Sequence, residues 1–475
     1  MATIPNFSEK WNGPIIFIGF GSIGKAALPL VLRHIEAKPE QIVIIDPNNN
    51  NSAIAHEYGV RFINEKVTEA NHKELVGGLM RASAERSLII NVSVNVSSKD
   101  IIALALAHNA IYVDTTIDPW DGEYFDTNIS MGDRSNYALR ESLLELKDTH
   151  PTGSTAVSCC GANPGMVSWL VKQALINLAN DIGTSYEKPQ TREGWAKLMQ
   201  TLGVKGVHIA ERDTQIANIP REEGCFMNTW SAEGCLAESI QPAELGWGTH
   251  EKSLPIGGKE HAYGCKAAIY IETPAAGVHI QTWTPSDGHH HGFLITHNEA
   301  ISISDYFTVR EGETVTYRPT CHYAYRPSSV AIASLNEFID NNYTPQKKTH
   351  VLSPDEIDSG MDELGVLLYG HEKNAYWYGS QLTIEEAREL APHQNATGLQ
   401  VSSAVLAGAI WAIRHPNEGL TEADEMDFEE CLDIQRPYLG KVCGHYTDWN
   451  PLKSIGGEKV VKDESDPWQF QNIRV

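Results

Sequence analysis

The chain has few basic residues, no paired cysteines and no long apolar run. Lys and Arg together number 37 against 61 Asp and Glu, which gives a formal net charge of -24. That charge argues against nucleic acid as a partner and attracts cations instead. None of the eight cysteines lies in a C-x-x-C pair, and Cys159 and Cys160 are adjacent. The sequence therefore predicts neither a zinc knuckle nor a disulfide framework.

Targeting and membrane segments are also missing from the pattern. The first residues show no charged region followed by an apolar run, and no later stretch reaches the roughly 18 apolar residues that a membrane helix needs. Internal repeats and low-complexity tracts are absent as well. These features predict a soluble, cytoplasmic protein that has no membrane partner.

A glycine-rich turn near the start of the chain is the strongest positive feature. The run Pro14-Ile-Ile-Phe-Ile leads into Gly19-x-Gly21-x-x-Gly24, and a helical pattern follows from Lys25 to about Ile35. This order of strand, glycine turn and helix is typical of dinucleotide-binding folds. Free N–H groups at the start of the helix, at Ser22 and Ile23, would face the pyrophosphate.

A second predicted strand decides between the two nicotinamide dinucleotides. Gln41-Ile-Val-Ile-Ile-Asp46 ends in a carboxylate about 20 residues after the turn, where the ribose 2′-hydroxyl of NAD is expected. A 2′-phosphate would be repelled by the charge of Asp46. NAD is therefore the predicted cofactor rather than NADP.

The first 155 residues alternate between strand and helix patterns, as a parallel sheet requires. Further strands are predicted at 60–64, 88–94 and 110–116, with helices at 71–84 and 98–108. Ser93, Asp114 and Thr115 then follow the carboxyl ends of strands, where such folds hold their ligand. We expect these three residues on the nicotinamide side of the cofactor.

The chain changes character near residue 156. Residues 154–160 read as a strand, and Gly161-Ala-Asn163-Pro-Gly165 as a turn before a helix from Met166 to about Leu178. Past this point a mostly antiparallel sheet is predicted, with strands at 266–272, 277–283, 292–297, 300–304 and 314–319.

Three domains or segments follow from this pattern. We predict a Rossmann-type dinucleotide-binding domain over 1–155, an α+β domain over 156–397, and a C-terminal segment over 416–475. Helices are expected at 328–339 and 383–390. The very apolar helix at about 398–415 should pack back on the first domain. The tail from Gly456 should lie on the surface.

Several segments together carry a resemblance to a known family. They are the glycine turn with Asp46, Gly161-Ala-Asn-Pro-Gly-Met166, Asn228-Thr-Trp-Ser-Ala-Glu-Gly234, His297-Asn-Glu-Ala-Ile-Ser302, Ser359-Gly-Met-Asp-Glu-Leu-Gly-Val-Leu-Leu368 and Gln400-Val-Ser-Ser-Ala-Val-Leu-Ala-Gly408. Over nearly its whole length the chain resembles the bacterial homospermidine synthases of the saccharopine dehydrogenase-like group. The resemblance implies a homodimer with tightly held NAD. It also implies conversion of two putrescines, or of putrescine and the aminobutyl group of spermidine, to homospermidine with loss of ammonia.

That chemistry needs acidic groups for diammonium ions and an aromatic face near the reacting carbon. Trp230, in a small and polar setting, is the predicted aromatic face, because a cation over an indole gains about 0.5 to 2 kcal/mol. The carboxylates Glu211, Glu238 and Asp362 lie beside small or apolar neighbours and are the predicted amine ligands. Asp118 is expected to guard the entrance.

Proton transfer and positioning are assigned to three more residues. His297 is the predicted proton shuttle, and Glu299 could take this role instead or assist it. Asn163 is expected beside the cofactor, where its side-chain carbonyl would position an amine. The run His289-His290-His291 suggests metal ligands, but adjacent residues of an extended strand point to opposite faces and share one ion poorly, so we predict no metal site there.

Two alternatives stay open at this point. An opine-type or saccharopine-type dehydrogenase would reduce an imine between an amino acid and a keto acid, and its carboxylate-bearing substrate would need paired arginines. A non-catalytic NAD-sensing or scaffold protein would keep the glycine turn and need no acidic amine pocket.

Overall fold

A seven-stranded parallel sheet forms one half of the molecule, in a computed structural model that describes residues 7–126, 128–453 and 463–475. Its strands are short, apolar and almost wholly buried, as expected for a sheet covered on both faces. In order across the sheet they are β24 (Leu420–Glu422), β8 (Ala156–Ser158), β7 (Ile111–Asp114), β6 (Leu88–Asn91), β2 (Ile15–Ile18), β4 (Ile42–Ile45) and β5 (Arg61–Ile63).

The strand order reverses at β2, and this positions the cofactor crevice. The chain runs outward from β2 through β4 to β5, then crosses back to β6 on the other side of β2. Ligands of open α/β sheets bind at such a switch point. The glycine turn follows β2 and leads into helix α1 (Ser22–His34). Ser93 follows β6, so both lie at the crevice.

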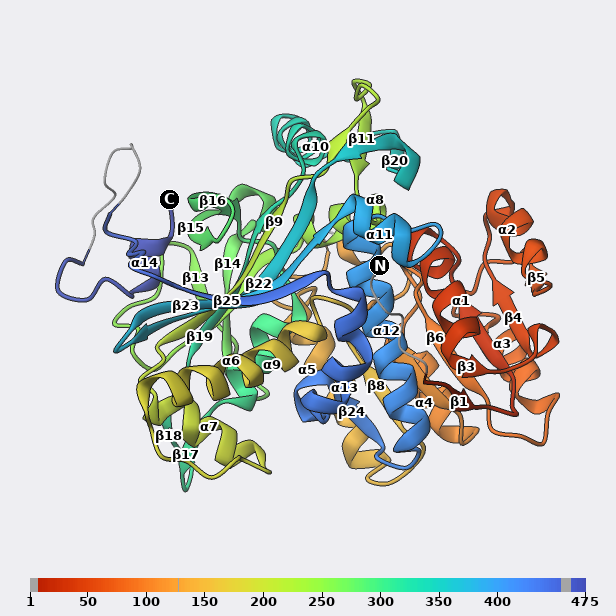
Figure 1. Cartoon of the computed structure of the whole chain (residues 1–475), viewed down its shortest axis with the longest axis horizontal. Helices are drawn as coiled ribbons and strands as arrows, with labels where there is room; N and C mark the ends of the chain where they lie inside the picture. Colours follow the sequence, from red (N-terminus) through yellow and green to blue (C-terminus); the bar gives the residue numbers. More distant parts are fainter. Residues whose placement is uncertain (1–6, 127, 454–462) are drawn as a thin grey trace.

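A larger, mostly antiparallel sheet forms the other half, and Figure 1 shows it facing the parallel sheet across a layer of helices. Within the described residues it has ten strands, and β9 (Gly206–Asp213) and β19 (Thr320–Arg326) are its parallel central pair. The other strands are β12 (Pro242–Gly246), β13 (Gly258–Glu260), β14 (Ala268–Pro274), β15 (His279–Thr284), β16 (Gly288–Phe293), β22 (Met361–His371), β23 (Asn374–Thr383) and β25 (Lys441–Thr447).

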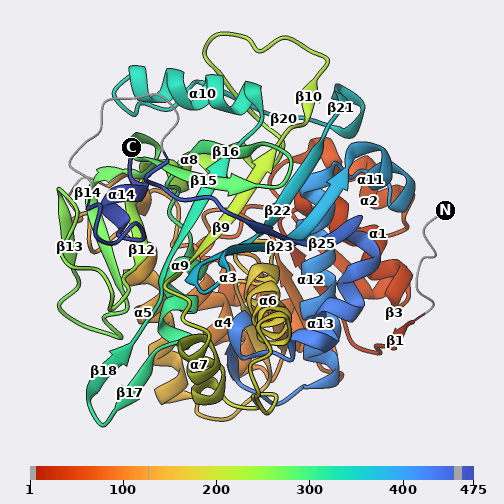
Figure 2. The ribbon, with the colours of Figure 1, turned by 60° about the vertical axis from the view of Figure 1, so that its left-hand side comes forward.

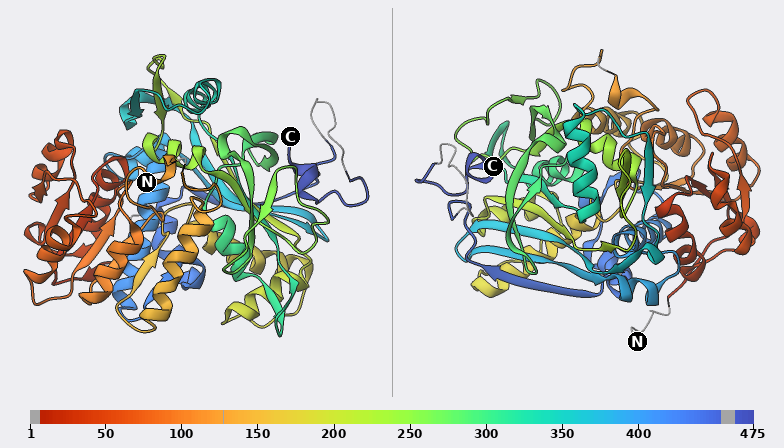
Figure 3. Two further views of the ribbon diagram at one scale, coloured as in Figure 1. Left: turned by 180° about the vertical axis from the view of Figure 1, so that it is seen from behind. Right: turned by 90° about the horizontal axis from the view of Figure 1, so that it is seen from above.

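Helix α12 (Ala396–Arg414) joins the two halves. It packs against α1 and against β7, on the first domain, and it also contacts β22 and β23. Figure 3 shows this blue helix between the red first domain and the second sheet. In length and composition it could cross a membrane, yet 89% of its most apolar window is buried inside the protein. Such burial is what a core helix between two sheets requires.

The end of the chain adds to both sheets. β24 becomes the edge strand of the parallel sheet beside β8, and β25 pairs with β23 in the second sheet. Of the tail predicted to lie on the surface, residues 456–462 lie outside the described residues. For the remainder the prediction is wrong, because Trp468, Phe470 and Ile473 are buried against the second sheet. Figure 2 shows this last segment, α14 (Phe470–Ile473), beside β12 and β14.

The second domain also departs from the sequence prediction at residues 300–304. The alternation Ala-Ile-Ser-Ile-Ser suggested a strand, whereas the segment belongs to helix α9 (Asn298–Tyr306). Every residue of α9 is buried, so no polar face shows the 3.6-residue period that distinguishes a helix in the sequence. The central strands β9, β19 and β22 were not predicted.

Candidate active site

A cavity of about 820 Å³ lies over the glycine turn at the switch point of the parallel sheet. Its lining includes six of the predicted cofactor residues: Gly19, Gly21, Ser22, Ile23, Asp46 and Ser93. Gly24 and Asp114 line neither this cavity nor the adjoining one. A Cβ at Gly24 would lie 2.7 Å from the carbonyl oxygen of Gly19, so this glycine permits close packing of α1. The Asp114 carboxylate accepts hydrogen bonds from the Cys159 amide and the Tyr112 hydroxyl.

The turn is shaped to admit a dinucleotide. Gly19 has a φ of +90°, and a Cβ there would lie 2.7 Å from the backbone of Ser93. A Cβ at Gly21 would meet nothing within 4 Å, so the backbone at Gly21 faces open space in the cavity. The Asp46 carboxylate is held at the rim by the amides of Phe20 (2.6 Å) and Asn48 (2.7 Å). These residues fit the pyrophosphate and the ribose of a dinucleotide.

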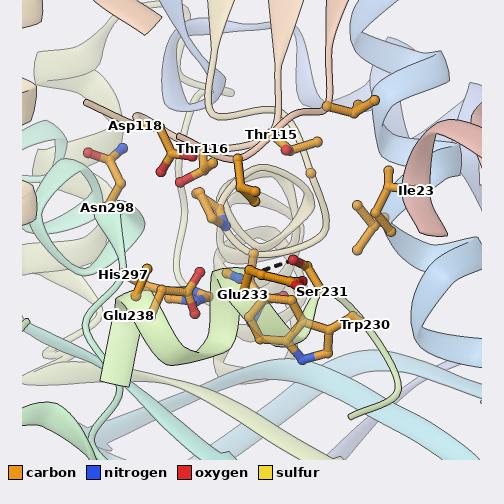
Figure 4. Close-up of a pocket in the computed structure, with 18 of the residues that line it drawn as sticks. Ile23, Thr115, Thr116, Asp118, Trp230, Ser231, Glu233, Glu238, His297 and Asn298 are labelled. Atoms are coloured by element: carbon orange, nitrogen blue, oxygen red, sulfur yellow. Dashed lines mark hydrogen bonds and ion pairs between the residues drawn. The ribbon is translucent and has the colours of Figure 1, made fainter. Parts of the chain in front are cut away.

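A second cavity, of about 900 Å³, adjoins the first at Ile23 and Ser93. Figure 4 shows side chains of both domains converging on it, with Thr115 and Asp118 opposite Trp230, Glu238 and His297. We call this second cavity the amine chamber. Eight of the predicted residues line it: Ile23, Ser93, Thr115, Asp118, Asn163, Trp230, Glu238 and His297.

His297 sits between two carboxylates at the floor of the amine chamber. Its Nε2 lies 2.9 Å from Glu238 on α8 (Ala232–Ile240), and its Nδ1 lies 3.1 Å from Glu299. Burial alone would lower the pKa of His297, but Glu238 and Glu299 raise it well above its ordinary value. Burial raises the pKa of Glu238, although His297 opposes the shift. The imidazole is therefore doubly protonated at neutral pH and donates to both carboxylates.

Asn163 connects the chamber to a buried acid. Its amide nitrogen donates to Glu211 at 2.9 Å, and the Tyr323 hydroxyl donates to the same oxygen at 2.5 Å. Burial raises the pKa of Glu211 to about 7, against these two hydrogen bonds. Because the nitrogen of Asn163 is held by Glu211, its carbonyl oxygen is the atom left to accept from a substrate ammonium group.

Two further acids lie behind Glu211. Asp213 follows it by two residues on β9, on the same face of the strand, and accepts from Thr229 at 2.6 Å. Asp362 on β22 accepts from Thr397 at 2.5 Å. Burial, and then the charges of Glu211 and Asp213, raise the pKa of Asp362 well above its ordinary value. Glu211, Glu299 and Asp362 thus stand behind the chamber wall rather than on it.

Asp118 lies across the chamber from α8, as Figure 4 shows. Its carboxylate accepts from the Asn95 amide and from the Tyr124 hydroxyl, both at 3.0 Å. Burial, together with a smaller contribution from the charge of Glu238, raises the pKa of Asp118 to about 6. The role at the entrance stays a prediction.

Sequence reasoning missed several residues in the wall of the amine chamber and behind it. Tyr323 and Tyr325 lie two apart on β19, and their rings stack with centroids 5.1 Å apart. The alternation in Thr-Cys-His-Tyr-Ala-Tyr was a usable strand signal that would have put both rings on one face. Asn298, Thr116 and Glu233 also line the chamber, and no motif distinguishes them in the sequence.

In the part of the chain that the structure describes, neither a metal-binding cluster nor an arginine contributes to either cavity. Within residues 7–126, 128–453 and 463–475, no group of three His, Cys, Asp or Glu side chains is placed to hold a metal ion. The run His289 to His291 forms part of β16 and pairs with β15. Among the described residues no arginine lines either cavity, so neither offers the bidentate carboxylate recognition that an opine-type substrate would need.

Comparisons with known proteins agree with this geometry. Residues 15–157 match the saccharopine dehydrogenase NADP binding domain, and residues 161–447 match the saccharopine dehydrogenase C-terminal domain. The homospermidine synthase of Mesorhizobium japonicum is 53% identical, over 98% of this chain and 99% of that protein. The homospermidine synthase of Blastochloris viridis is 54% identical, over 98% of each chain. The chain belongs to the homospermidine synthase family.

A solved member of the homospermidine synthase family has the same fold. The crystal structure of the Legionella pneumophila homospermidine synthase, in complex with NAD, matches with a TM-score of 0.91 and 43% identity, over 99% of each chain. The resemblance found in the sequence motifs and the predicted fold class, a Rossmann-type domain plus a mostly antiparallel α+β domain, are confirmed. Membership of this family makes the chain an enzyme and excludes the scaffold alternative.

Proposed function

We propose that the protein joins two putrescine molecules into homospermidine and releases ammonia, with NAD bound throughout the cycle. The observation that carries the proposal is the amine chamber itself. It opens onto the dinucleotide crevice, it is walled by an indole and backed by buried carboxylates, and no arginine of the described chain lines it. That lining suits a diammonium substrate and does not suit a keto acid.

NAD is the cofactor that the crevice supports. Bound there, its nicotinamide would take a hydride from the carbon beside one putrescine amine and return it after the second amine has displaced ammonia, so the net redox change is zero. Ser93 and Thr115 would lie beside the nicotinamide, and Gly21 to Ile23 beside the pyrophosphate. The Asp46 carboxylate favours a free ribose 2′-hydroxyl over a 2′-phosphate, even though the matching domain model carries NADP in its description.

The protein groups divide the proton transfers between them. Only a neutral amine can give up the hydride, so a carboxylate must accept the ammonium proton. Glu211 is the group we assign to this step, because its pKa is raised to about 7 and its carboxylate lies 2.9 Å from the side chain of Asn163 at the chamber wall. The doubly protonated His297 has a proton to give to departing ammonia, and Glu238 and Glu299 stabilise its charge.

Trp230 supports the positive charge that appears during the transfer. Its ring borders the chamber, where an iminium or ammonium group over the indole would gain about 2 kcal/mol once water is excluded. Exclusion of water also protects the imine from loss as an aldehyde. Asp118 at the opposite wall would draw the second amine inward.

A labelling experiment tests the proposed reaction. The enzyme is incubated with catalytic NAD and with putrescine that carries deuterium on the carbon beside one amine. We expect homospermidine and ammonia in equal amounts, with deuterium retained in the product and no accumulation of NADH. Stoichiometric NADH formation, or a requirement for a keto acid, would refute the proposal in favour of a dehydrogenase.

We also propose that the enzyme is a cytoplasmic homodimer, as the family resemblance implies. Light scattering at micromolar concentration tests the dimer, and fractionation of cells that express the chain tests the location. A monomeric mass or a membrane-bound fraction would contradict these two proposals without affecting the proposed reaction.

A further inference from the structure

The indole of Trp230 is held from the side that faces away from the amine chamber. Its Nε1–H donates to the hydroxyl of Tyr325 at 3.0 Å. Figure 4 shows this nitrogen directed away from Thr115 and Asp118, on the far side of the ring from the chamber. At Gly234, in the first turn of α8, a Cβ would lie only 3.2 Å from Cζ3 of the indole. The ring is thus confined by a hydrogen bond at one edge and by backbone at another.

The Tyr325 side chain is itself held in place by the packing around it. It is wholly buried near the end of β19, where its backbone pairs with Glu211 of β9 and with Phe293 of β16. Its ring stacks on that of Tyr323 with an angle of 18° between the planes. A hydroxyl held between two strands and a stacked neighbour cannot follow a moving indole.

The two stacked tyrosines make different hydrogen bonds. The Tyr323 hydroxyl donates to Glu211, whereas the Tyr325 hydroxyl accepts from Trp230. Burial, and then the charges of Glu211 and Asp213, raise the pKa of Tyr325 well above its ordinary value. Tyr325 is therefore a neutral phenol at neutral pH, and its oxygen accepts from the indole N–H.

We propose that Tyr325 is a positioning residue for the amine transfer, fixing the plane of the Trp230 indole against the reacting carbon of the polyamine. The proposal rests on the function proposed above. Rotation about the bond that carries an aromatic ring is soft, with broad minima, and attraction of a cation to an indole depends on the cation lying over the ring face. Loss of the hydrogen bond between Tyr325 and the indole should therefore lower kcat and leave the affinity for the outer amine of the substrate unchanged.

The test is Tyr325→Phe, which keeps the stacked ring and removes only the hydroxyl. We expect kcat to fall about fivefold, the worth of one hydrogen bond, while KM for putrescine, the Kd of NAD and Tm stay near wild type. Tyr369→Phe is the matched control. Tyr369 is also fully buried in the same sheet, but its hydroxyl has no hydrogen-bond partner among the described residues, so kcat should not change.

A double-mutant cycle separates positioning from a purely structural effect. Phe at position 230 has no N–H, so in a Trp230→Phe background Tyr325→Phe should cause no further loss of kcat. An equal fivefold loss in both backgrounds, or an unchanged kcat in Tyr325→Phe alone, would overturn the proposal. If Trp230→Phe by itself leaves the rate unchanged, the role given to the indole in the proposed function fails, and that result is distinguishable from a failure of Tyr325.

Discussion

The dinucleotide crevice and the amine chamber adjoin each other, yet they are built in opposite ways. The groups of the crevice that would contact the dinucleotide, the glycine turn and Asp46, come from one continuous stretch, Ile18 to Asp46, and residues after β6 and from the second domain complete the lining. The chamber collects side chains from α8, from the start of α9 and from the loops after β6, β7 and β8, with the side chains of β9 and β19 behind its wall. Local backbone geometry therefore sets cofactor binding, whereas long-range packing sets amine chemistry, and substitutions in the two regions should separate accordingly.

The largest expected effect is on the crevice alone. Gly21→Val would place methyl groups in the space that faces the pyrophosphate, where a Cβ now meets nothing within 4 Å. We expect the affinity for NAD to fall about 100-fold, equivalent to roughly 2.7 kcal/mol, while Tm without cofactor stays within a few degrees of wild type. Titration calorimetry and thermal melts measure the two quantities. A large fall in the cofactor-free Tm would show that the turn is needed for folding rather than for binding.

The converse prediction concerns the chamber. Trp230→Ala removes the aromatic face, and kcat should fall about 30-fold, corresponding to the roughly 2 kcal/mol of a desolvated cation–π contact. NAD affinity should be unchanged, because the lesion leaves the glycine turn intact. Glu238→Gln should act in the same direction by removing the charge opposite His297. Loss of NAD binding in either variant would erase the distinction between the two regions.

The same distinction explains what the sequence predicts and what it does not. Gly19, Gly21, Ser22, Ile23 and Asp46 lie in the cavity because their roles depend on positions within one strand–turn–helix unit, which a local pattern specifies.

Long-range pairing leaves no comparable local signal. Tyr325 on β19 and Trp230 just before α8 are 95 residues apart, and they meet only through the packing of distant elements, which nothing near either residue indicates. Asp114 shows the reverse case. It follows a strand as predicted, yet its carboxylate serves the Cys159 amide and the Tyr112 hydroxyl. Helix α9 was mistaken for a strand because complete burial hides the helical period.

Glu211, the buried acid behind the amine chamber, should lower the stability of the folded protein once the pH is high enough to ionise it. The pKa of Glu211 is about 7 in the folded protein because of burial, above its value in an unfolded chain. The contribution of protonated Glu211 to the free energy of unfolding is therefore fully present below about pH 4.5. It is lost as the pH rises toward 7, and stability stays reduced above that pH. At pH 8, Glu211→Gln should increase the free energy of unfolding of the cofactor-free protein by about 2 kcal/mol, which thermal melts would show as a higher Tm. Near pH 5 the variant and the wild type should have the same Tm.

Activity should respond to Glu211 in the opposite direction. If its carboxylate accepts the ammonium proton, kcat/KM rises with pH through about 7 in the wild type. Glu211→Gln should lower kcat/KM and abolish that limb. An unchanged pH profile in the variant would assign the limb to another group and leave Glu211 a structural acid.

The smallest expected effect is a change in the preference for NAD over NADP on substitution of Asp46. It tests what the charge of this residue contributes to the crevice. Asp46 does two things at once, since its carboxylate holds the amides of Phe20 and Asn48 and its charge would repel a 2′-phosphate. Asp46→Ala removes both, whereas Asp46→Asn removes the charge and keeps an oxygen acceptor. We expect the preference for NAD over NADP to fall about tenfold in each, close to 1.4 kcal/mol, with NAD affinity itself weakened mainly in the alanine variant. Equal losses of NAD affinity in the two variants would mean that charge, rather than support of the turn, is what Asp46 contributes to NAD binding.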